Sequence, residues 1–98
     1  MPITNNNLFP LTQKMIDSMA HDVPGVYYLA RPNGEIALIE AARKMKTELL
    51  DHLAGPAGKI ATKFAVTLCS DPAAELQKVL DEFQAAHQRL PELNQARP

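Results

Sequence analysis

A predicted β-hairpin in the first half of the chain limits the available folds more than any other feature. Residues 25–30 (GVYYLA) are expected to form a strand, with alternate side chains on its two faces. The following residues favour a turn, because Pro32 fixes φ and the pair Asn33-Gly34 tolerates positive φ. Residues 35–39 (EIALI) are then expected to return as the second strand. The chain is therefore expected to build an antiparallel sheet.

Apolar spacing predicts three helices and one more strand. Helices are expected at residues 10–19, 40–53 and 71–90, and Asp71 is a good N-cap for the last of them. A short, partly β-branched run at residues 64–69 predicts a third strand, which could begin two or three residues earlier. The expected fold class is α+β, a small three-stranded antiparallel sheet flanked by helices in the order α-β-β-α-β-α.

The length of 98 residues suits one small domain whose core needs neither a disulfide nor a metal. We assign residues 10–94 to this domain, residues 1–9 to a flexible N-terminal arm and residues 95–98 to a tail. The one cysteine, Cys69, excludes an internal disulfide and is expected to be a buried structural thiol. No secretory signal and no bilayer-length apolar run are present, so a cytoplasmic protein without membrane association is expected.

The hairpin and the helix after it carry a family resemblance. Residues 24–28 (PGVYY), residues 36–40 (IALIE) and the helical run that follows resemble the core of GIY-YIG nucleases. Within this family, the resemblance is to the N-terminal nuclease domain of the protein that makes the incisions in bacterial nucleotide excision repair. Its pattern is P-G-V-Y, a hairpin, Y-V-G-K-A and a helix with an arginine, and no gap is needed between residues 24 and 53. The resemblance implies a GIY-YIG-like fold.

Four of the five family positions that can be aligned have lost their residue type. Tyr27 keeps the first tyrosine of the family. The other positions are those of the second tyrosine, the motif glycine, the lysine after it and the arginine, and they are occupied here by Leu38, Glu40, Ala41 and Glu48. In the family, the tyrosines help to activate the attacking water and the arginine stabilises charge on the phosphate. The resemblance therefore implies a catalytically inactive pseudo-nuclease.

The position of the family's metal-binding glutamate depends on which segment is used to align it. Matching residues 91–94 (PELN) to the family's terminal P-x-Y-N places it at Glu82. Matching residues 70–71 at the start of the last helix places it near Lys78 instead. A solvated surface glutamate on an amphipathic helix is the simpler interpretation of Glu82.

The leading functional hypothesis is a protein-interaction or regulatory module. Glu40 and Glu48 would face the former substrate cleft and could receive a basic segment of a protein partner that the sequence does not identify. A helix-to-helix contact or a homodimer is equally open, through adaptable methionines on helical faces, namely Met15, Met19 and Met45. No cofactor and no metal are expected, because three dispersed histidines and one cysteine give no common zinc pattern.

Two alternatives remain open from the sequence. Residues 41–63 carry five basic against two acidic side chains, although the formal net charge of the chain is -1. The first alternative is a nucleic-acid-binding accessory that does not cleave and uses these five cations: Arg43, Lys44, Lys46, Lys59 and Lys63. The second is a metal-dependent nuclease with a relocated site, built from Tyr27, either His52 or His87, and Glu82.

Overall fold

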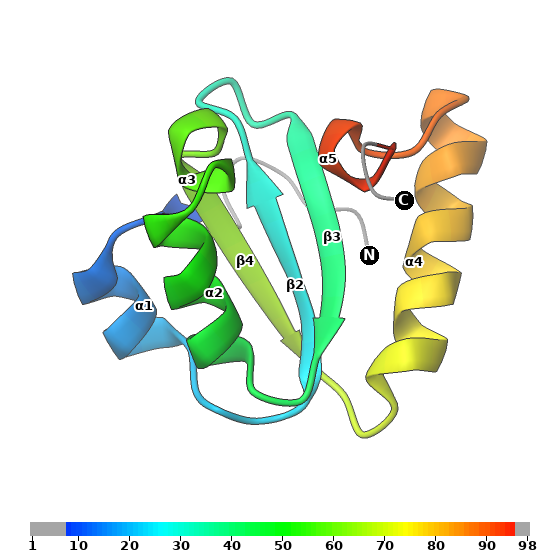
Figure 1. Cartoon of the computed structure of the whole chain (residues 1–98). Coiled ribbons are helices and arrows are strands. Elements are labelled where there is room, and N and C mark those ends of the chain that lie inside the picture. The colour runs from blue at the N-terminus through cyan, green and yellow to red at the C-terminus, as the bar shows by residue number, and fades with distance from the viewer. Residues whose placement is uncertain (1–7, 96–98) are drawn as a thin grey trace.

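A four-stranded antiparallel sheet forms the centre of the computed structural model, which describes residues 8–95 (Figure 1). The strands are β1 (Phe9–Pro10), β2 (Gly25–Ala30), β3 (Ile36–Ala42) and β4 (Lys63–Leu68), in the spatial order β1-β4-β2-β3. All six residues of β2 are buried, because β2 lies between β4 and β3 and because its side chains pack in cores on both faces of the sheet.

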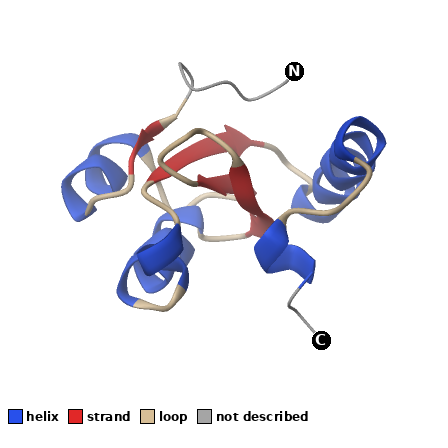
Figure 2. Cartoon of the chain, turned by 90° about the horizontal axis from the view of Figure 1, so that it is seen from above, coloured by secondary structure: helices blue, strands red, loops and turns tan. Residues whose placement is uncertain are grey.

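Within residues 8–95, five helices surround this sheet, and they cover both of its faces (Figure 2). They are α1 (Gln13–Met19), α2 (Met45–Ala54), α3 (Ala57–Ile60), α4 (Pro72–His87) and α5 (Glu92–Gln95). One face carries α1 and α2 over a core that includes Tyr27 and Phe64. The other face packs against α4 through a smaller core that includes Tyr28 and Ile39. The alternation of β2 thus sends its two adjacent tyrosines into different cores.

Side chains close to the helix ends explain where the helices begin. The Thr12 hydroxyl accepts a hydrogen bond from the backbone N–H of Met15 at the start of α1. Asp71 accepts one from the Ala74 N–H at the start of α4, as its position before Pro72 predicts. The N-cap residue of α2 makes no side-chain hydrogen bond.

The α+β class and the antiparallel hairpin predicted from the sequence are confirmed. The strand at 25–30 has the predicted bounds, and Gly34 adopts a positive φ of 89° in the turn. The strand predicted at 64–69 is β4, shifted by one residue, and the long last helix begins as predicted.

The predicted number of strands and the predicted start of the second long helix are wrong. The sheet has four strands and not three, because β1 pairs with Phe64 and Lys63 at the start of β4. The helix expected from residue 40 begins at Met45, because β3 continues to Ala42 and pairs there with β2. Cross-strand pairing outweighs the helical propensity of these residues.

The ends of the predicted segments also differ from those observed. The last long helix stops at His87, where Gln88 takes the left-handed conformation, and two short helices, α3 and α5, were not expected. Of the predicted arm at residues 1–9, Phe9 begins β1 and residues 1–7 lie outside the described residues. Residues 96–98 of the predicted tail lie outside them as well.

Helix α5 closes the outer edge of β3. The Asn94 side chain accepts a hydrogen bond from the Ile39 N–H and donates one to the Ile39 carbonyl, both at 2.9 Å. An ion pair between Arg31 and Glu92 fastens the same helix to the hairpin turn. Along residues 8–95, no helix is both long and apolar enough to span a membrane.

Candidate functional site

Three polar side chains meet on the α2 face of the sheet. Tyr27 on β2 lies directly opposite Glu40 on β3, and His52 reaches them from the last turn of α2. The Tyr27 hydroxyl oxygen is 2.7 Å from His52 Nε2 and 3.3 Å from Glu40 Oε1. Tyr27 is completely buried, at 0% exposure. We call these three residues the tyrosine cluster.

The packing of α2 determines where His52 points. Met45 and Leu49 are both buried on the side of the helix that faces the sheet. His52 follows Leu49 by three residues, so it lies on the same side of the helix. The two rings of Tyr27 and His52 are tilted by 56°, with centroids 5.6 Å apart. The cluster therefore belongs to the edge of the main core.

Burial determines the protonation state of His52. It lowers the pKa of His52, and Glu48 and Asp51 act weakly in the opposite direction, so the ring is neutral at neutral pH. With its proton on Nε2, the ring donates to Tyr27, and Tyr27 donates to Glu40. With its proton on Nδ1, the hydroxyl must give its one proton to either His52 or Glu40. The first tautomer satisfies both contacts.

Stability is expected to fall as the pH is lowered below about 6.5, the ordinary pKa of histidine. The folded state has the depressed pKa, so the unfolded chain binds a proton before the folded chain does, and the loss continues down to the folded pKa. Urea unfolding at pH 5 to 8 measures this, and His52→Gln is expected to flatten the dependence over this range. A wild-type protein that gains stability on acidification would mean that the Glu40 carboxylate, 3.4 Å from Nε2, controls the ring instead.

The remaining family positions are spread over both faces of the sheet. Leu38 is buried in the main core with Tyr27, and Glu48 is exposed in the first turn of α2. Ala41 packs with the smaller core on the α4 face. The structure thus groups Tyr27, Leu38 and Glu40 on the face covered by α2.

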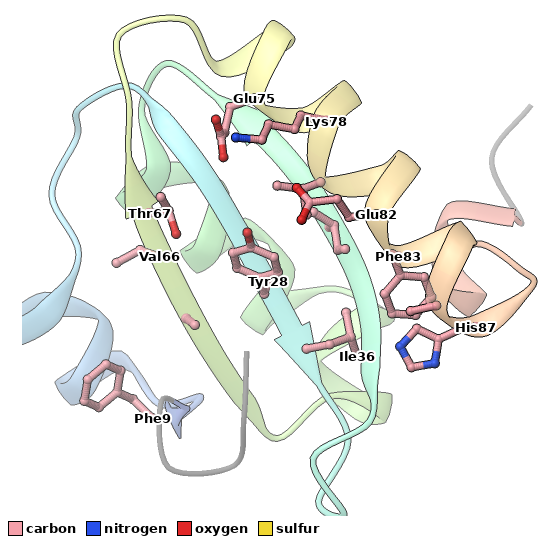
Figure 3. Close-up of a pocket in the computed structure, with 14 residues that line it drawn as sticks. Phe9, Tyr28, Ile36, Val66, Thr67, Glu75, Lys78, Glu82, Phe83 and His87 are labelled. Carbon is pink, nitrogen blue, oxygen red and sulfur yellow. The ribbon is translucent and has the colours of Figure 1, made fainter. Parts of the chain in front are cut away.

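Glu82 and His87 lie on the other side of the sheet from Tyr27. Both line a groove beside α4, together with Tyr28 (Figure 3). The residues considered for a relocated nuclease site are therefore divided, with Tyr27 and His52 on one face and Glu82 and His87 on the opposite face. Within residues 8–95, no three His, Cys, Asp or Glu side chains come together in a group that could hold a metal ion.

The groove beside α4 has a volume of about 660 Å³ and lies between that helix and the sheet, with residues of all four strands in its lining. Figure 3 shows Glu75, Lys78 and Glu82 extending from α4 toward these strands. Burial raises the pKa of the Tyr28 hydroxyl, a hydrogen bond with Thr67 lowers it, and Glu75 and Glu82 raise it further. Both carboxylates therefore act on the interior of the groove.

Sequence reasoning did not identify this groove. Glu82 is exposed, as expected of a surface glutamate on an amphipathic helix, and it also borders the groove. The sequence of α4 contains a pattern that indicates the groove. Three charged residues repeat there at the same helical spacing as the apolar residues Val79 and Phe83, namely Glu75, Lys78 and Glu82. Polar side chains at the same spacing as the apolar ones indicate a helix face that is only partly covered, and no described residue of α4 is fully buried.

The five basic residues do not form one patch. Arg43, Lys44 and Lys46 follow the end of β3, at the end of the sheet where Ala42 pairs with Gly25. Lys59 and Lys63 lie at the opposite end, where Lys63 pairs with Ala30. The six residues of β2 separate these two ends by roughly 17 Å. In addition, Lys46 is paired with Asp17 at 3.4 Å.

The methionines and the cysteine differ in their exposure. Met45 is completely buried, Met15 is half-buried and Met19 is 39% exposed, so Met45 has no free surface for a partner. Cys69 lies just after β4 and is half-buried beside the smaller core. Burial raises the pKa of its thiol, and Glu75 and Asp71 raise it further.

Comparison with protein-family models found none that matches this chain, and comparison with curated proteins found no similar protein.

Proposed function

We propose that this chain is a catalytically inactive GIY-YIG-like domain that acts by binding another protein. The observation that carries the proposal is the state of Tyr27, the one family position that keeps its residue type. Its hydroxyl is buried and lies within hydrogen-bonding distance of His52 and Glu40. A hydroxyl engaged in this way is not free to orient a water for attack on a phosphodiester.

The charges near Tyr27 also oppose nuclease chemistry. Glu40 lies 3.3 Å from its hydroxyl, and Glu48 stands where the resemblance places the arginine. A phosphodiester approaching this site would meet carboxylates where the family presents a cation, so the local interaction would be repulsive. Loss of the positive charge removes the electrostatic stabilisation that is usually the largest catalytic contribution.

The arrangement of Glu82 supports the same conclusion. If Glu82 corresponds to the family's metal-binding glutamate, it should share a site with Tyr27. Glu82 lines the groove on the α4 face, and Tyr27 packs in the core on the α2 face. A ligand held at Glu82 would be separated from the Tyr27 hydroxyl by the thickness of the sheet.

A protein is favoured as the partner over nucleic acid. The five basic residues are divided between two ends of the sheet, and Lys46 is already paired with Asp17. Nucleic-acid binding depends on cations that neutralise neighbouring phosphates along one surface. The groove beside α4 instead has mainly apolar walls with acidic side chains above them, which suits a polypeptide.

No metal-dependent cleavage is expected when duplex and single-stranded DNA are incubated with the protein and Mg²⁺ or Mn²⁺. The Glu82→Ala variant should behave as the wild type does, because Glu82 and Tyr27 lie on different faces. Gel analysis of labelled DNA measures cleavage, and anisotropy at low salt measures binding. Cleavage that disappears in both Glu82→Ala and Tyr27→Phe would show a working nuclease and contradict the proposal.

A further inference from the structure

Among the described residues, the outer edge of β4 has a strand partner only at its first two positions. Within residues 8–95, β1 pairs only with Lys63 and Phe64 of β4, and residues 65–68 have no strand partner on that side. These four residues (AVTL) contain no charge and no proline, the features that normally protect an edge strand. Leu68, at the end of this edge, is 67% exposed.

The open edge borders the groove beside α4. Ala65, Val66 and Thr67 of β4 line the groove on one side, and Val79 and Phe83 of α4 line it on the other. Helix α4 packs mainly over β3 and β2 (Figure 1). On the β4 side of this face, Leu8 packs against the smaller core that includes Ala65, and Phe9 lines the groove (Figure 3). A strand added beside β4 would project every second side chain onto this face, opposite α4.

The charged side chains of the groove select for a basic occupant. Glu75 and Glu82 place two carboxylates on the α4 wall of the groove against the one ammonium group of Lys78. Both carboxylates raise the pKa of Tyr28 at the floor. A lysine or arginine of the occupant would therefore be attracted between α4 and Tyr28.

We propose that an extended segment of a partner protein, with alternating apolar and basic residues, binds as a fifth strand along residues 65–68 of β4. Its main chain pairs with the open edge, and its side chains on the α4 face enter the groove near Glu75 and Glu82. Its side chains on the opposite face cover Leu68. Strand addition between an edge strand and a helix is an established mode of peptide recognition. The inference rests on the proposed function as a protein-binding domain and names the surface and chemistry of the partner.

A second copy of this chain fits the edge less well. Two-fold pairing of β4 with another β4 leaves at most four residues on each side, because β1 already occupies the edge at Lys63 and Phe64. In such a dimer, the strand added to each copy would be residues 65–68 of the other copy. These residues contain no lysine or arginine that could pair with the acidic side chains of the groove.

The test uses a phage-displayed library of random dodecapeptides selected on the immobilised domain. Selected peptides are expected to alternate apolar residues with lysine or arginine. Fluorescence anisotropy with the synthetic labelled peptide should show that Glu82→Lys weakens binding by about tenfold. The matched control is Asp81→Lys, which makes the same charge change on an exposed neighbour outside the groove, and its affinity should equal that of the wild type.

N-methylation of the peptide tests strand pairing without changing the protein. A series of peptides is made, each with a methyl group on one backbone nitrogen. Methylation of every second residue should abolish binding and methylation of the residues between should not, because only alternate N–H groups of an added strand face the edge. The amide resonances of residues 65–68 should shift on binding. Peptides that bind with shifts over α1 and α2, or without the two-residue period, would overturn strand addition and leave the protein-binding function standing. Strand addition would also be overturned if no peptide were selected, or if the protein dimerised through β4 without peptide. DNA cleavage, in contrast, would contradict the proposed function alone.

Discussion

Gly25→Ala is expected to destabilise the domain by about 3 kcal/mol, because the sheet leaves no room for a side chain at this position. An added Cβ would collide with the backbone carbonyl oxygen of Thr67 and would lie 2.6 Å from the Sδ of Met45. Met45 could move at some cost, since its side chain is flexible. The Thr67 carbonyl belongs to the neighbouring strand β4, so β2 and β4 would have to separate. Urea unfolding measured at neutral pH gives the free energy of unfolding.

Gly55→Ala provides the matched control for this prediction. A Cβ at Gly55 would meet its nearest backbone atom, the Asp51 carbonyl oxygen, at 3.3 Å, and its φ of -99° suits any residue. This variant is expected to stay within about 1 kcal/mol of the wild type. Equal stabilities of Gly25→Ala and Gly55→Ala would show that β2 and β4 tolerate a wider spacing than the structure has.

This close packing explains why residue 25, in the P-G-V-Y segment, is a glycine. Gly25 allows Met45 at the start of α2 to approach the strand, and Met45 is buried as a result. Among the residues that carry the resemblance to GIY-YIG nucleases, Gly25 therefore has a packing role in this chain.

Local chemistry explains which strands could be predicted. The hairpin of β2 and β3 depends on the turn at Pro32 to Gly34, which is encoded in adjacent residues. Strand β1 has two residues and exists through pairing with Phe64, which is more than fifty positions away. No pattern within such a short segment distinguishes it from a loop.

The error in the predicted start of α2 explains why the tyrosine cluster was not predicted. Residues 40–42 (EAA) have high helical propensity, so the helix was expected to begin at residue 40. In the structure these residues extend β3, which places Glu40 opposite Tyr27. The tyrosine cluster depends on this pairing and on the orientation of His52, and neither could be derived from spacing along the chain. The groove beside α4 was missed for a related reason, since it depends on how little of the sheet that helix covers.

Within residues 8–95, the two edges of the sheet differ in how much of each is covered. The edge of β3 is covered by α5 through the Asn94 side chain, which pairs with Ile39 as a neighbouring strand would. The edge of β4 has such cover only at Lys63 and Phe64 among the described residues. Among residues 8–95, β4 therefore offers more unpaired edge than β3 does, which favours β4 as the place for an added strand.

Asn94→Asp is expected to destabilise the domain by about 2 kcal/mol at neutral pH. The carboxylate can still accept from the Ile39 N–H, but it replaces the donor to the Ile39 carbonyl with a second acceptor. The pKa of the introduced carboxyl should therefore lie above its ordinary value, so the folded state binds its proton first and the variant should recover stability as the pH falls through that pKa.

Asn33→Asp makes the same chemical change where only an acceptor is used. The Asn33 side chain accepts from the Glu35 N–H in the hairpin turn, and an aspartate can do the same. Its stability should stay within about 0.5 kcal/mol of the wild type across the neutral range. Urea unfolding of both variants at pH 4 to 8 compares them directly. If Asn94→Asp loses no more stability than Asn33→Asp, or shows no recovery on acidification relative to it, the Asn94 amide does not hold α5 on β3, and the contrast between a covered and an open edge disappears with it.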